Sequence, residues 1–364
     1  MGNHSGRRGN RAMSRVRLPI LAVVAVIALA GCGGAMEPGS AAGSPSTPRH
    51  SAPAPTPAPS ATHRSYTYQD LVVGFIQSGS QSGWLAANTA SFNDVASVQG
   101  ITVKFHDSKF SLANQIAAFE QFIADPTVSV IVLNAIAGTG YDDVLRSAKA
   151  AGKVVVLEGT PLVADPDLYY TYVGSDYERE GRVAGAAMCD ALKASQSKDV
   201  VEIAGPSDAS AALGRGKGFR EATECHMNIL DSTNAGGWDV ATAKSIMADD
   251  LKVYSGRIQG VVAQSDEMAI AAIQAISASG LKAGKDISVI GFDATADGFK
   301  YLIEGTLFAD VECNPLLAPQ VYDAALRGLN GDTSTPKWIP AQEGMFRADQ
   351  GADSLSGRLR HSRY

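Results

Sequence analysis

Residues 128–133 read VSVIVL and residues 154–157 read VVVL, and between them residues 141–151 carry apolar side chains at helical spacing. The two runs are rich in β-branched residues, which is typical of strands, and the segment between them is long enough for a helix. Because both runs are apolar apart from Ser129, we expect each strand to be covered on both faces. The stretch therefore predicts a β-α-β unit within a parallel sheet.

The same alternation extends over residues 66–346 and falls into two series. The first series holds strand-like runs and helical patterns, in chain order, at 71–76, 84–98, 101–105, 112–123, 128–133, 141–151 and 154–157. The second holds strand-like runs at 200–204, 229–231, 258–263 and 287–292, with helical patterns near 178–194, 211–224, 240–251, 268–279 and 297–304. Two such series predict an α/β protein of two doubly wound lobes, whose ligands bind at the carboxyl ends of the strands.

The composition fits two domains and excludes two classes of protein. The chain has 364 residues, of which 45% are hydrophobic, and 37 acidic against 31 basic residues give a net charge of −6. Such a chain is too apolar to be mostly disordered. It is also not basic enough to bind nucleic acid by neutralising phosphates, so we expect no nucleic-acid partner.

Residues 1–31 predict an export signal. Arg15 and Arg17 precede an apolar run at 18–30. As a helix this run would span about 20 Å, short of the roughly 30 Å of a bilayer core. A basic segment, a short apolar run and small residues at its end are typical of a secretory signal peptide. The sequence leaves open whether translation starts at Met1 or Met13.

Leu29-Ala30-Gly31-Cys32 resembles the bacterial lipobox. The resemblance implies that Cys32 becomes the mature N-terminus and carries lipid such as palmitate, which anchors the protein to the outer face of the bacterial cell membrane. The alternative is an ordinary signal peptide with an incidental cysteine. Residues 32–66 are rich in Pro, Ala and Ser and predict an extended tether. Residues 348–364 are polar and predict a flexible tail.

The folded body lacks the common motifs of catalysis and metal binding. Only His106 and His226 of the six histidines lie in it, and no HExxH pattern occurs. Residues 79–83 read GSQSG, whose centre is glutamine, so they do not form a serine nucleophile elbow. Residues 214–218 read GRGKG, which is neither a Walker A loop nor GxGxxG. We therefore expect no enzyme activity, no metal and no cofactor.

Three cysteines, Cys189, Cys225 and Cys313, remain in the folded body. An extracytoplasmic setting permits a disulfide. Cys189 and Cys225 fall on predicted helices that flank one strand, so they could meet. The sequence leaves open whether these two are bridged or are buried free thiols.

Four segments carry a resemblance to a known family. They are residues 73–84 (VGFIQSGSQSGW), residues 210–212 (SAA) with Arg215 and 217–219 (KGF), residues 265–269 (SDEMA) with 291–293 (GFD), and residues 311–317 (VECNPLL) with 336–339 (PKWI) and 343–344 (EG). In these segments the body resembles the type I periplasmic sugar-binding proteins of ABC importers, the ribose- and galactose-binding group. Within that group it is most similar to the galactofuranose-binding type.

The resemblance implies a type I periplasmic-binding-protein-like fold. Two Rossmann-like lobes would be joined by three hinge crossings, near residues 172–175, 311–314 and 338–340. The N-terminal lobe would hold residues 67–173 and 314–338, and the C-terminal lobe residues 174–313 and 339–347. Sugar would bind in the cleft between the lobes.

A sugar needs flat aromatic side chains for its C–H faces, and amides or carboxylates for its hydroxyls. Positions that match the family's sugar contacts are Trp84, Glu158, Arg215, Trp238, Ser265 (where the family has Asn) and Asp293. Further candidates lie on loops after strands or at a crossing, namely Gln77, Gln81, Asn134 and Asn314. Alternatives stay open: core packing for the tryptophans, helix capping for Asp293, and a salt bridge at a hinge or helix start for Arg215.

Two departures from the galactofuranose-binding type affect the expected ligand. That type has Glu-Ser-Gly-Trp-Arg where this chain has QSGWL at residues 81–85, and it has an arginine in the place of Gly159. Two guanidinium groups, each with up to five donors, are therefore missing. A ligand chosen by those groups would leave oxygens unpaired. The sequence predicts instead a neutral monosaccharide or a linear polyol.

These observations predict a monomeric, lipid-anchored substrate-binding protein of a carbohydrate ABC importer. It would deliver its sugar or polyol to a membrane permease that works with an ATPase. The alternative is a sensory sugar receptor lipoprotein that signals to a membrane kinase, because both functions need only a two-lobed body that closes. A secreted hydrolase is disfavoured, since histidines are few and the nucleophile motif is missing.

Overall fold

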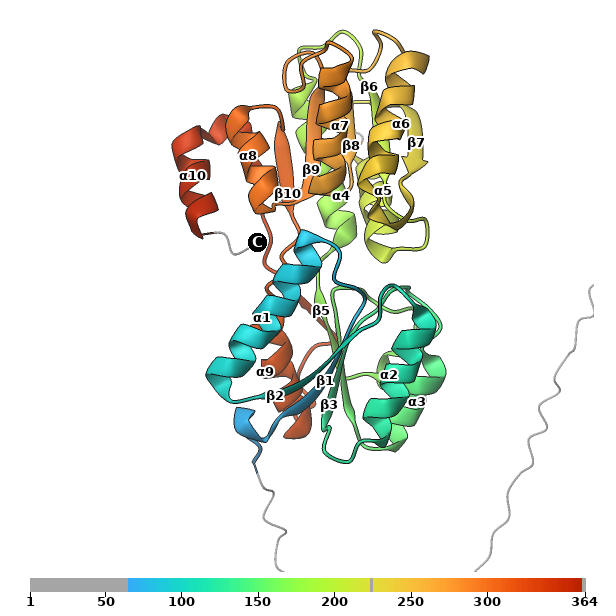
Figure 1. Ribbon diagram of the computed structural model, residues 1–364, viewed down its shortest axis with the longest axis vertical. Coiled ribbons are helices and arrows are strands. Elements are labelled where there is room, and N and C mark those ends of the chain that lie inside the picture. Colours follow the sequence, from blue (N-terminus) through green and yellow to red (C-terminus); the bar gives the residue numbers. More distant parts are fainter. Residues whose placement is uncertain (1–64, 223–224, 362–364) are drawn as a thin grey trace, which may run out of the picture. The chain divides into compact units, whose positions relative to one another are not determined.

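The computed structural model describes residues 65–222 and 225–361. Within them the chain forms two six-stranded sheets, each covered by helices on both faces (Figure 1). The predicted signal peptide, the lipidation site at Cys32 and the tether as far as residue 64 lie outside the described residues. In the described ranges no helix is long and apolar enough to cross a bilayer.

The first sheet has the strand order β11-β5-β4-β3-β1-β2, and its neighbouring strands are parallel. Its strands are β1 (Val72–Gln77), β2 (Thr102–Asp107), β3 (Val130–Asn134), β4 (Val154–Glu158), β5 (Thr171–Gly174) and β11 (Trp338–Pro340). One face is covered by α1 (Gly83–Gln99) and α9 (Ala318–Leu329), the other by α2 (Leu112–Ala124) and α3 (Asp142–Ala150). Because β1 pairs with both β2 and β3, the strand order reverses beside the carboxyl end of β1, where such folds bind ligands.

The second sheet has the order β12-β10-β9-β8-β6-β7, and only β12 is antiparallel to its neighbour. Its strands are β6 (Asp199–Ala204), β7 (Asn228–Asn234), β8 (Gly260–Ala263), β9 (Ser288–Asp293), β10 (Ala309–Glu312) and β12 (Met345–Arg347). One face is covered by α4 (Tyr177–Ala191) and α5 (Ser210–Glu221). The other is covered by α6 (Val240–Val253), α7 (Asp266–Ala278), α8 (Ala296–Glu304) and α10 (Ala352–His361).

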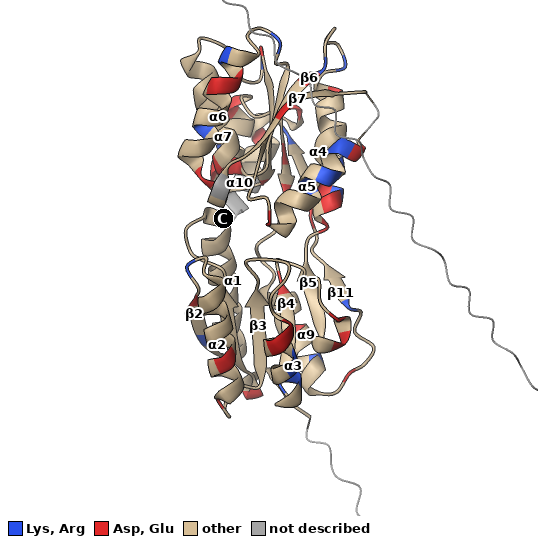
Figure 2. Ribbon diagram, turned by 90° about the vertical axis from the view of Figure 1, so that its right-hand side faces the viewer, with Lys and Arg blue, Asp and Glu red and all other residues tan. Residues whose placement is uncertain are grey.

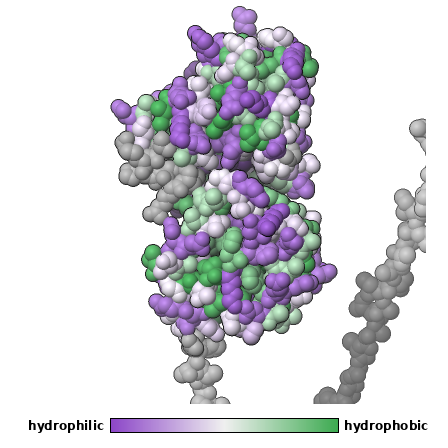
Figure 3. All heavy atoms as spheres, viewed as in Figure 1, coloured by the Kyte–Doolittle hydropathy of each residue, from purple (hydrophilic) through white to green (hydrophobic). Residues whose placement is uncertain are grey.

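Local sequence explains where the helices begin and end. The Ser82 side chain accepts a hydrogen bond from Leu85 N (3.2 Å) and caps α1, which ends at Gly100 with a left-handed φ of 74°. Every residue of β3 is buried, as its continuous apolar run predicts. Hydrophilic and hydrophobic residues are interspersed over the face shown in Figure 3. Most large apolar side chains of the described residues lie in buried clusters beside the two sheets.

The described chain passes between the two sheets three times, at residues 175–176, 313–317 and 341–344. The predicted fold of two lobes joined by three crossings is therefore confirmed. The third crossing is displaced from its predicted place at 338–340. Those residues form β11, and the pairing of Ile339 with Val173 of β5 keeps them in the first sheet, not in the second lobe.

The polar C-terminal segment was predicted to be a flexible tail from residue 348, and this is wrong for the part that the structure describes. A 3-10 turn (Ala348–Gln350) leads into α10, which packs beside α8 (Figure 1). Leu355 is 1% exposed and joins the core cluster that contains Phe299 of α8. One buried leucine in a polar segment gives no helical pattern of apolar residues, so the sequence did not reveal this helix.

Helices α4 and α5 pack so closely that only glycine fits at their contact. A Cβ added to Gly218 would lie 1.9 Å from the Glu178 carbonyl oxygen. Acidic and basic residues lie side by side on these helices (Figure 2), including an ion pair between Lys217 and Glu178 at 2.7 Å. A disulfide joins Cys189 on α4 to Cys225 beyond α5, with their Cα atoms 5.5 Å apart. The two cysteines whose state the sequence left open are thus bridged in the structure.

Replacing both Cys189 and Cys225 with alanine is expected to lower the free energy of unfolding by about 2–4 kcal/mol. The bridge closes a loop of 36 residues, and removing it returns conformational freedom to the unfolded chain. Urea denaturation of the oxidised protein, the reduced protein and the variant measures the effect. Reduced protein should match the variant, since Cys313 is a buried free thiol. Equal stability of oxidised protein and variant would contradict the prediction.

Candidate ligand-binding site

Three polar side chains stand at the carboxyl edge of the first sheet. Gln77, Asn134 and Glu158 are the last residues of β1, β3 and β4, and Asn134 lies opposite Glu158 in the register. All three are buried, with exposed fractions of 0%, 4% and 0%. Apolar strand residues place them there, because the edge of a parallel sheet collects the residues that follow each buried run.

A buried helix residue, Asn88 on α1, connects these side chains. Its amide accepts from Gln77 Nε2 (2.7 Å) and donates to Glu158 Oε2 (3.3 Å). Glu158 Oε1 has no hydrogen-bond partner among the described residues. Burial raises the pKa of Glu158 to about 7, against the opposing amides of Asn134 and Asn88. This edge therefore holds one buried carboxyl oxygen that has no donor among the described residues.

Trp84 stands near the start of α1 and lies against Gly159. Its indole Nε1 donates to the Cys313 carbonyl oxygen at 2.8 Å, which fixes the ring beside the second crossing. Gly159 has φ 65°, and its carbonyl accepts hydrogen bonds from the hydroxyls of Tyr172 and Tyr177. A Cβ at Gly159 would lie 2.5 Å from Asn134 Nδ2 and 3.4 Å from Trp84 Cη2. A side chain at residue 159 would therefore have to displace the amide of Asn134.

The Gly159→Ala variant is expected to lose about 1–2 kcal/mol of stability from the left-handed backbone alone. It should also displace Asn134 and so weaken ligand binding. Gly256→Ala is the matched control, because Gly256 has φ 73° with nothing within 4 Å of its added Cβ. Thermal unfolding and ligand titration of both variants measure the two effects. Equal losses of stability and of ligand affinity in the two variants would show that the contact with Asn134 contributes to neither.

The second sheet places a buried ion-pair network at its carboxyl edge. Arg215 on α5 is 3% exposed and donates from Nε to Glu180 Oε2 (2.7 Å) and from Nη2 to Asp293 Oδ1 (3.1 Å). Nη1 donates to the Gln264 carbonyl oxygen at 2.6 Å. The guanidinium also lies 4.7 Å from the centre of the Phe292 ring. Every nitrogen of this guanidinium is thus bound to the protein itself.

The pKa values of this network follow from burial and from the one cation. Burial raises the pKa of Asp293 to about 7, and Arg215 opposes that rise. Burial likewise raises the pKa of Glu180, again against Arg215. For Arg215 burial lowers the pKa, but Glu180 and Asp293 outweigh it and hold that pKa well above its ordinary value. The arginine is therefore charged, Asp293 titrates near neutrality, and the pKa of Glu180 lies above its ordinary value.

The three crossings meet at Glu343, which lies on the third. Its Oε1 accepts from the Ser175 hydroxyl of the first crossing and from Asn314 N of the second, the latter at 3.1 Å. Burial raises the pKa of Glu343 to about 8, and the neighbouring Glu180 adds to the rise. Glu180, Cys313 and Glu343 bring three potential ligand atoms within 4.8 Å of one another. Because Arg215 already binds Glu180, a second cation is disfavoured there, and we assign no metal.

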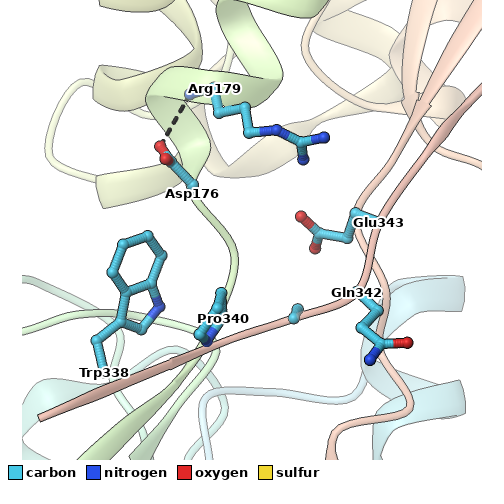
Figure 4. Close-up of a pocket in the computed structure, with 7 residues that line it drawn as sticks. Asp176, Arg179, Trp338, Pro340, Gln342 and Glu343 are labelled. Atoms are coloured by element: carbon cyan, nitrogen blue, oxygen red, sulfur yellow. Dashed lines mark hydrogen bonds between the residues drawn. The ribbon is translucent and has the colours of Figure 1, made fainter. Parts of the chain in front are cut away.

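A pocket of about 400 Å³ lies beside the first and third crossings. Figure 4 shows Trp338, Pro340 and Gln342 along one wall, with Asp176 and Arg179 from the start of α4 on the other. Glu343 also lines it. None of the ten predicted ligand-binding residues does, so this pocket is separate from the predicted site.

Four other predicted residues are placed as follows. Ser265 is buried and caps α7, accepting from Met268 N at 3.3 Å. Trp238 is partly buried and its ring covers Gly205 at the end of the second sheet. Gln81 is exposed on its loop, and its amide oxygen accepts only from Ser80 N. Asn314 donates to the Gln342 carbonyl oxygen at 3.3 Å and braces the second crossing. The structure thus brings Trp84, Asn134 and Glu158 together, and separately Arg215 and Asp293, but does not turn Gln81 toward either group.

Sequence reasoning missed four residues that hold these groups: Asn88, Glu180, Gln264 and Glu343. Gln264 donates to Glu202 Oε1 (2.8 Å) and accepts from Gly205 N (3.0 Å), which fixes the loop after β8. The available signal was weak: Gln264 follows a buried strand directly, whereas the others lie on helices or a crossing.

Comparison with known proteins places the chain among binding proteins. Residues 73–332 match the family described as periplasmic binding protein domain. The galactofuranose-binding protein YtfQ of Escherichia coli (strain K12) is 34% identical over 289 residues, which cover 78% of this chain and 90% of that protein. The crystal structure of a galactofuranose binding protein has a TM-score of 0.75 at 33% identity and covers 81% of this chain and 100% of its own.

A third relative is the periplasmic binding component of the arabinose ABC transporter from Shewanella sp. ANA-3, solved with α- and β-L-arabinofuranose. Its TM-score is 0.74 at 32% identity, over 80% of this chain and 99% of that one. The predicted likeness to the galactofuranose-binding type is confirmed by the first two relatives, and all three are named as binding proteins, the third as a component of an ABC transporter. With the family match over residues 73–332 and the two lobes joined by three crossings, this chain belongs to the type I periplasmic binding protein family.

Proposed function

We propose that this protein is the substrate-binding protein of a carbohydrate ABC importer. It binds a neutral monosaccharide or a linear polyol between its two lobes and delivers it to a membrane permease. One observation carries the proposal: each sheet ends in a buried carboxyl group, Glu158 and Asp293, and Trp84 stands beside the first. Carboxylates accept hydrogen bonds from hydroxyls, and an indole face covers the C–H groups of a sugar.

The charge of the site supports a neutral ligand. Arg215 donates to Glu180, Asp293 and a backbone carbonyl, so each of its guanidinium nitrogens is bound to the protein and its charge is balanced by two buried carboxyl groups. Gly159 supplies no second guanidinium, and a Cβ there would already lie 2.5 Å from Asn134 Nδ2. Glu158, Glu180 and Asp293 outnumber the one arginine, and in their ionised forms they repel a sugar acid or a sugar phosphate. The ligands named for the three relatives are galactofuranose and arabinofuranose, which supports testing sugars that form five-membered rings.

Calorimetric titration and thermal shift with a ligand panel test the proposal. The panel holds pentoses, hexoses and polyols, including galactose and L-arabinose, with a sugar acid and a sugar phosphate as negative controls. A ligand at 100 times its dissociation constant should stabilise the protein by about 2.7 kcal/mol. We expect at least one neutral compound to bind and both anions to fail. Absence of heat and of a thermal shift with every neutral compound would refute the proposal that the protein binds a neutral sugar or polyol.

Attachment to the membrane is the second part of the proposal. The lipobox-like sequence ending at Cys32 supports lipidation, which would hold the body near its permease on the outer face of the cell membrane. We expect the wild-type chain in the membrane fraction, and the Cys32→Ser variant released from it. Mass spectrometry of the N-terminal peptide identifies the lipid. Wild-type protein that carries no lipid and fractionates like the variant would contradict anchoring, whatever the outcome of the sugar titrations.

A further inference from the structure

Two fully buried carboxyl groups lie behind the candidate ligand residue Asp293. Asp266 opens α7 and Asp310 belongs to β10, and each is 0% exposed. Both face Gly298 of α8, where an added Cβ would lie 2.3 Å from Asp266 Oδ2 and 2.5 Å from Asp310 Oδ2. The helix therefore offers a glycine, with no side chain, at the place where the two carboxyl groups converge.

One oxygen of each carboxyl group holds the turn that follows β9. Asp310 Oδ1 accepts from Ala294 N at 3.1 Å, and Asp266 Oδ2 accepts from Thr295 N and Oγ1, both at 2.7 Å. This turn is strained, because Asp293 has φ 102° and Ala294 has φ 56°. L-residues adopt such values rarely and only where their surroundings impose them. The two aspartates thus impose the backbone that carries the Asp293 side chain.

The remaining oxygens have no donor. Asp266 Oδ1 and Asp310 Oδ2 are buried without a hydrogen-bond partner among the described residues. Two ionised carboxylates this close in a protein interior would repel each other, and each unpaired buried acceptor costs free energy. A proton on one group removes the repulsion and supplies the missing donor. In accord with this, burial raises the pKa of Asp310 to about 7 and that of Asp266 well above its ordinary value, and the charge of Asp310 adds to the rise at Asp266.

We propose that Asp266 and Asp310 share a proton at neutral pH and that this pair is the positioning device that aims the Asp293 carboxylate. Its link to ligand binding rests on the proposed function, whereas the shared proton does not. Two charged groups act on the pair from the elements around it. Asp293 on β9 favours the protonated pair, and Arg215 on α5 opposes it at Asp310. Both aspartates are fully buried, so they act on the ligand only through Asp293.

The variants Asp310→Asn and Asp266→Asn test the shared proton. In either variant the amide NH2 supplies the donor that otherwise requires a proton, while the amide oxygen still accepts from the turn. The wild-type folded state holds a proton that the unfolded state has released, so its stability is lost as pH rises through the folded pKa. We expect each single variant to lose stability less steeply than wild type as pH rises from about 4, where an unfolded Asp titrates, to about 7, the folded pKa of Asp310, with a difference of up to one proton in the slope. Asp297→Asn, on the exposed side of α8, is the control that should keep the wild-type slope.

The double variant Asp266→Asn with Asp310→Asn tests the positioning. Both amide oxygens are needed by the turn, so the two NH2 groups face each other and clash. We expect a lower melting temperature than in either single variant and an affinity for the sugar or polyol weakened about tenfold. The single variants should bind within about threefold of wild type.

Wild-type pH slopes in both single variants, or a double variant as stable as the singles, would overturn the proposal. The two hypotheses fail separately. If no ligand binds to wild-type protein, the slopes still decide whether the proton is shared. If ligand binds but the pH slopes of the single variants equal that of wild type, the shared proton is refuted and the proposed function is not. A double variant that does not fold leaves the decision to the single variants.

Discussion

Replacing Arg215 with methionine is expected to lower the free energy of unfolding by about 3–5 kcal/mol near neutral pH. The arginine is 3% exposed and pairs with Glu180 at 2.7 Å and with Asp293 at 3.1 Å. Methionine fills much of the same volume but leaves two buried carboxyl groups without their cation. Removing one partner from a buried ion-pair network destabilises the fold by more than the whole network stabilises it, because the remaining charges stay buried without a counter-ion.

The loss should grow with pH. Arg215 now opposes the burial that raises the pKa values of Asp293 and Glu180, so both values rise further once it is removed. The folded variant then keeps protons that its unfolded state gives up, and its stability is lost as pH rises through the folded values. Urea denaturation at pH 5 and pH 8 measures this, with Arg327→Met, 53% exposed on α9, as a control that should change by less than about 0.5 kcal/mol. A loss that is the same at both pH values would contradict the account.

Asp293→Asn is expected to weaken ligand binding by about 100-fold or more. In the proposed function the Asp293 carboxylate accepts hydrogen bonds from the ligand's hydroxyls, and each hydrogen bond to a charged group contributes about 1.5–3 kcal/mol. Asparagine keeps an oxygen for Arg215 and is among the residues that tolerate a left-handed φ, here 102°. The loss should therefore fall on binding and not on folding.

Calorimetry with the ligand found in the panel measures this loss. In wild type the affinity should rise as pH passes through about 7, because the ionised Asp293 accepts hydrogen bonds more strongly than the protonated form. In the variant this rise should shrink to the part contributed by Glu158. Asp297→Asn, exposed on α8, should bind like wild type. An affinity for ligand within threefold of wild type would remove Asp293 from the site.

Much of the fold could be predicted because strands covered on both faces leave continuous apolar runs in the sequence. The run at 128–133 became β3, and the run at 287–292 became β9 with only small shifts at the ends. The edge strands β11 and β12 have three residues each, too few to show a pattern. Helix α10 is held by Leu355 against α8, a contact that depends on the tertiary structure.

The site divides in the same way. Asn134, Glu158 and Asp293 end buried strands, so their position followed from the strands themselves. Asn88 could not be found, because its bond to Glu158 spans 70 residues of sequence and depends on how α1 lies on the sheet. Gln81 was assigned by its place in a loop, and sequence position gives no side-chain direction.

The hydrogen bonds of Glu343 have a mechanical consequence. One oxygen on the third crossing receives the Ser175 hydroxyl and Asn314 N, so the three connecting segments are fastened at a single point. A change of backbone conformation in one segment therefore strains the hydrogen bonds that connect it to the other two. We therefore expect Glu343 to lie at the hinge of any rotation of one lobe against the other, and the three connecting segments to move together.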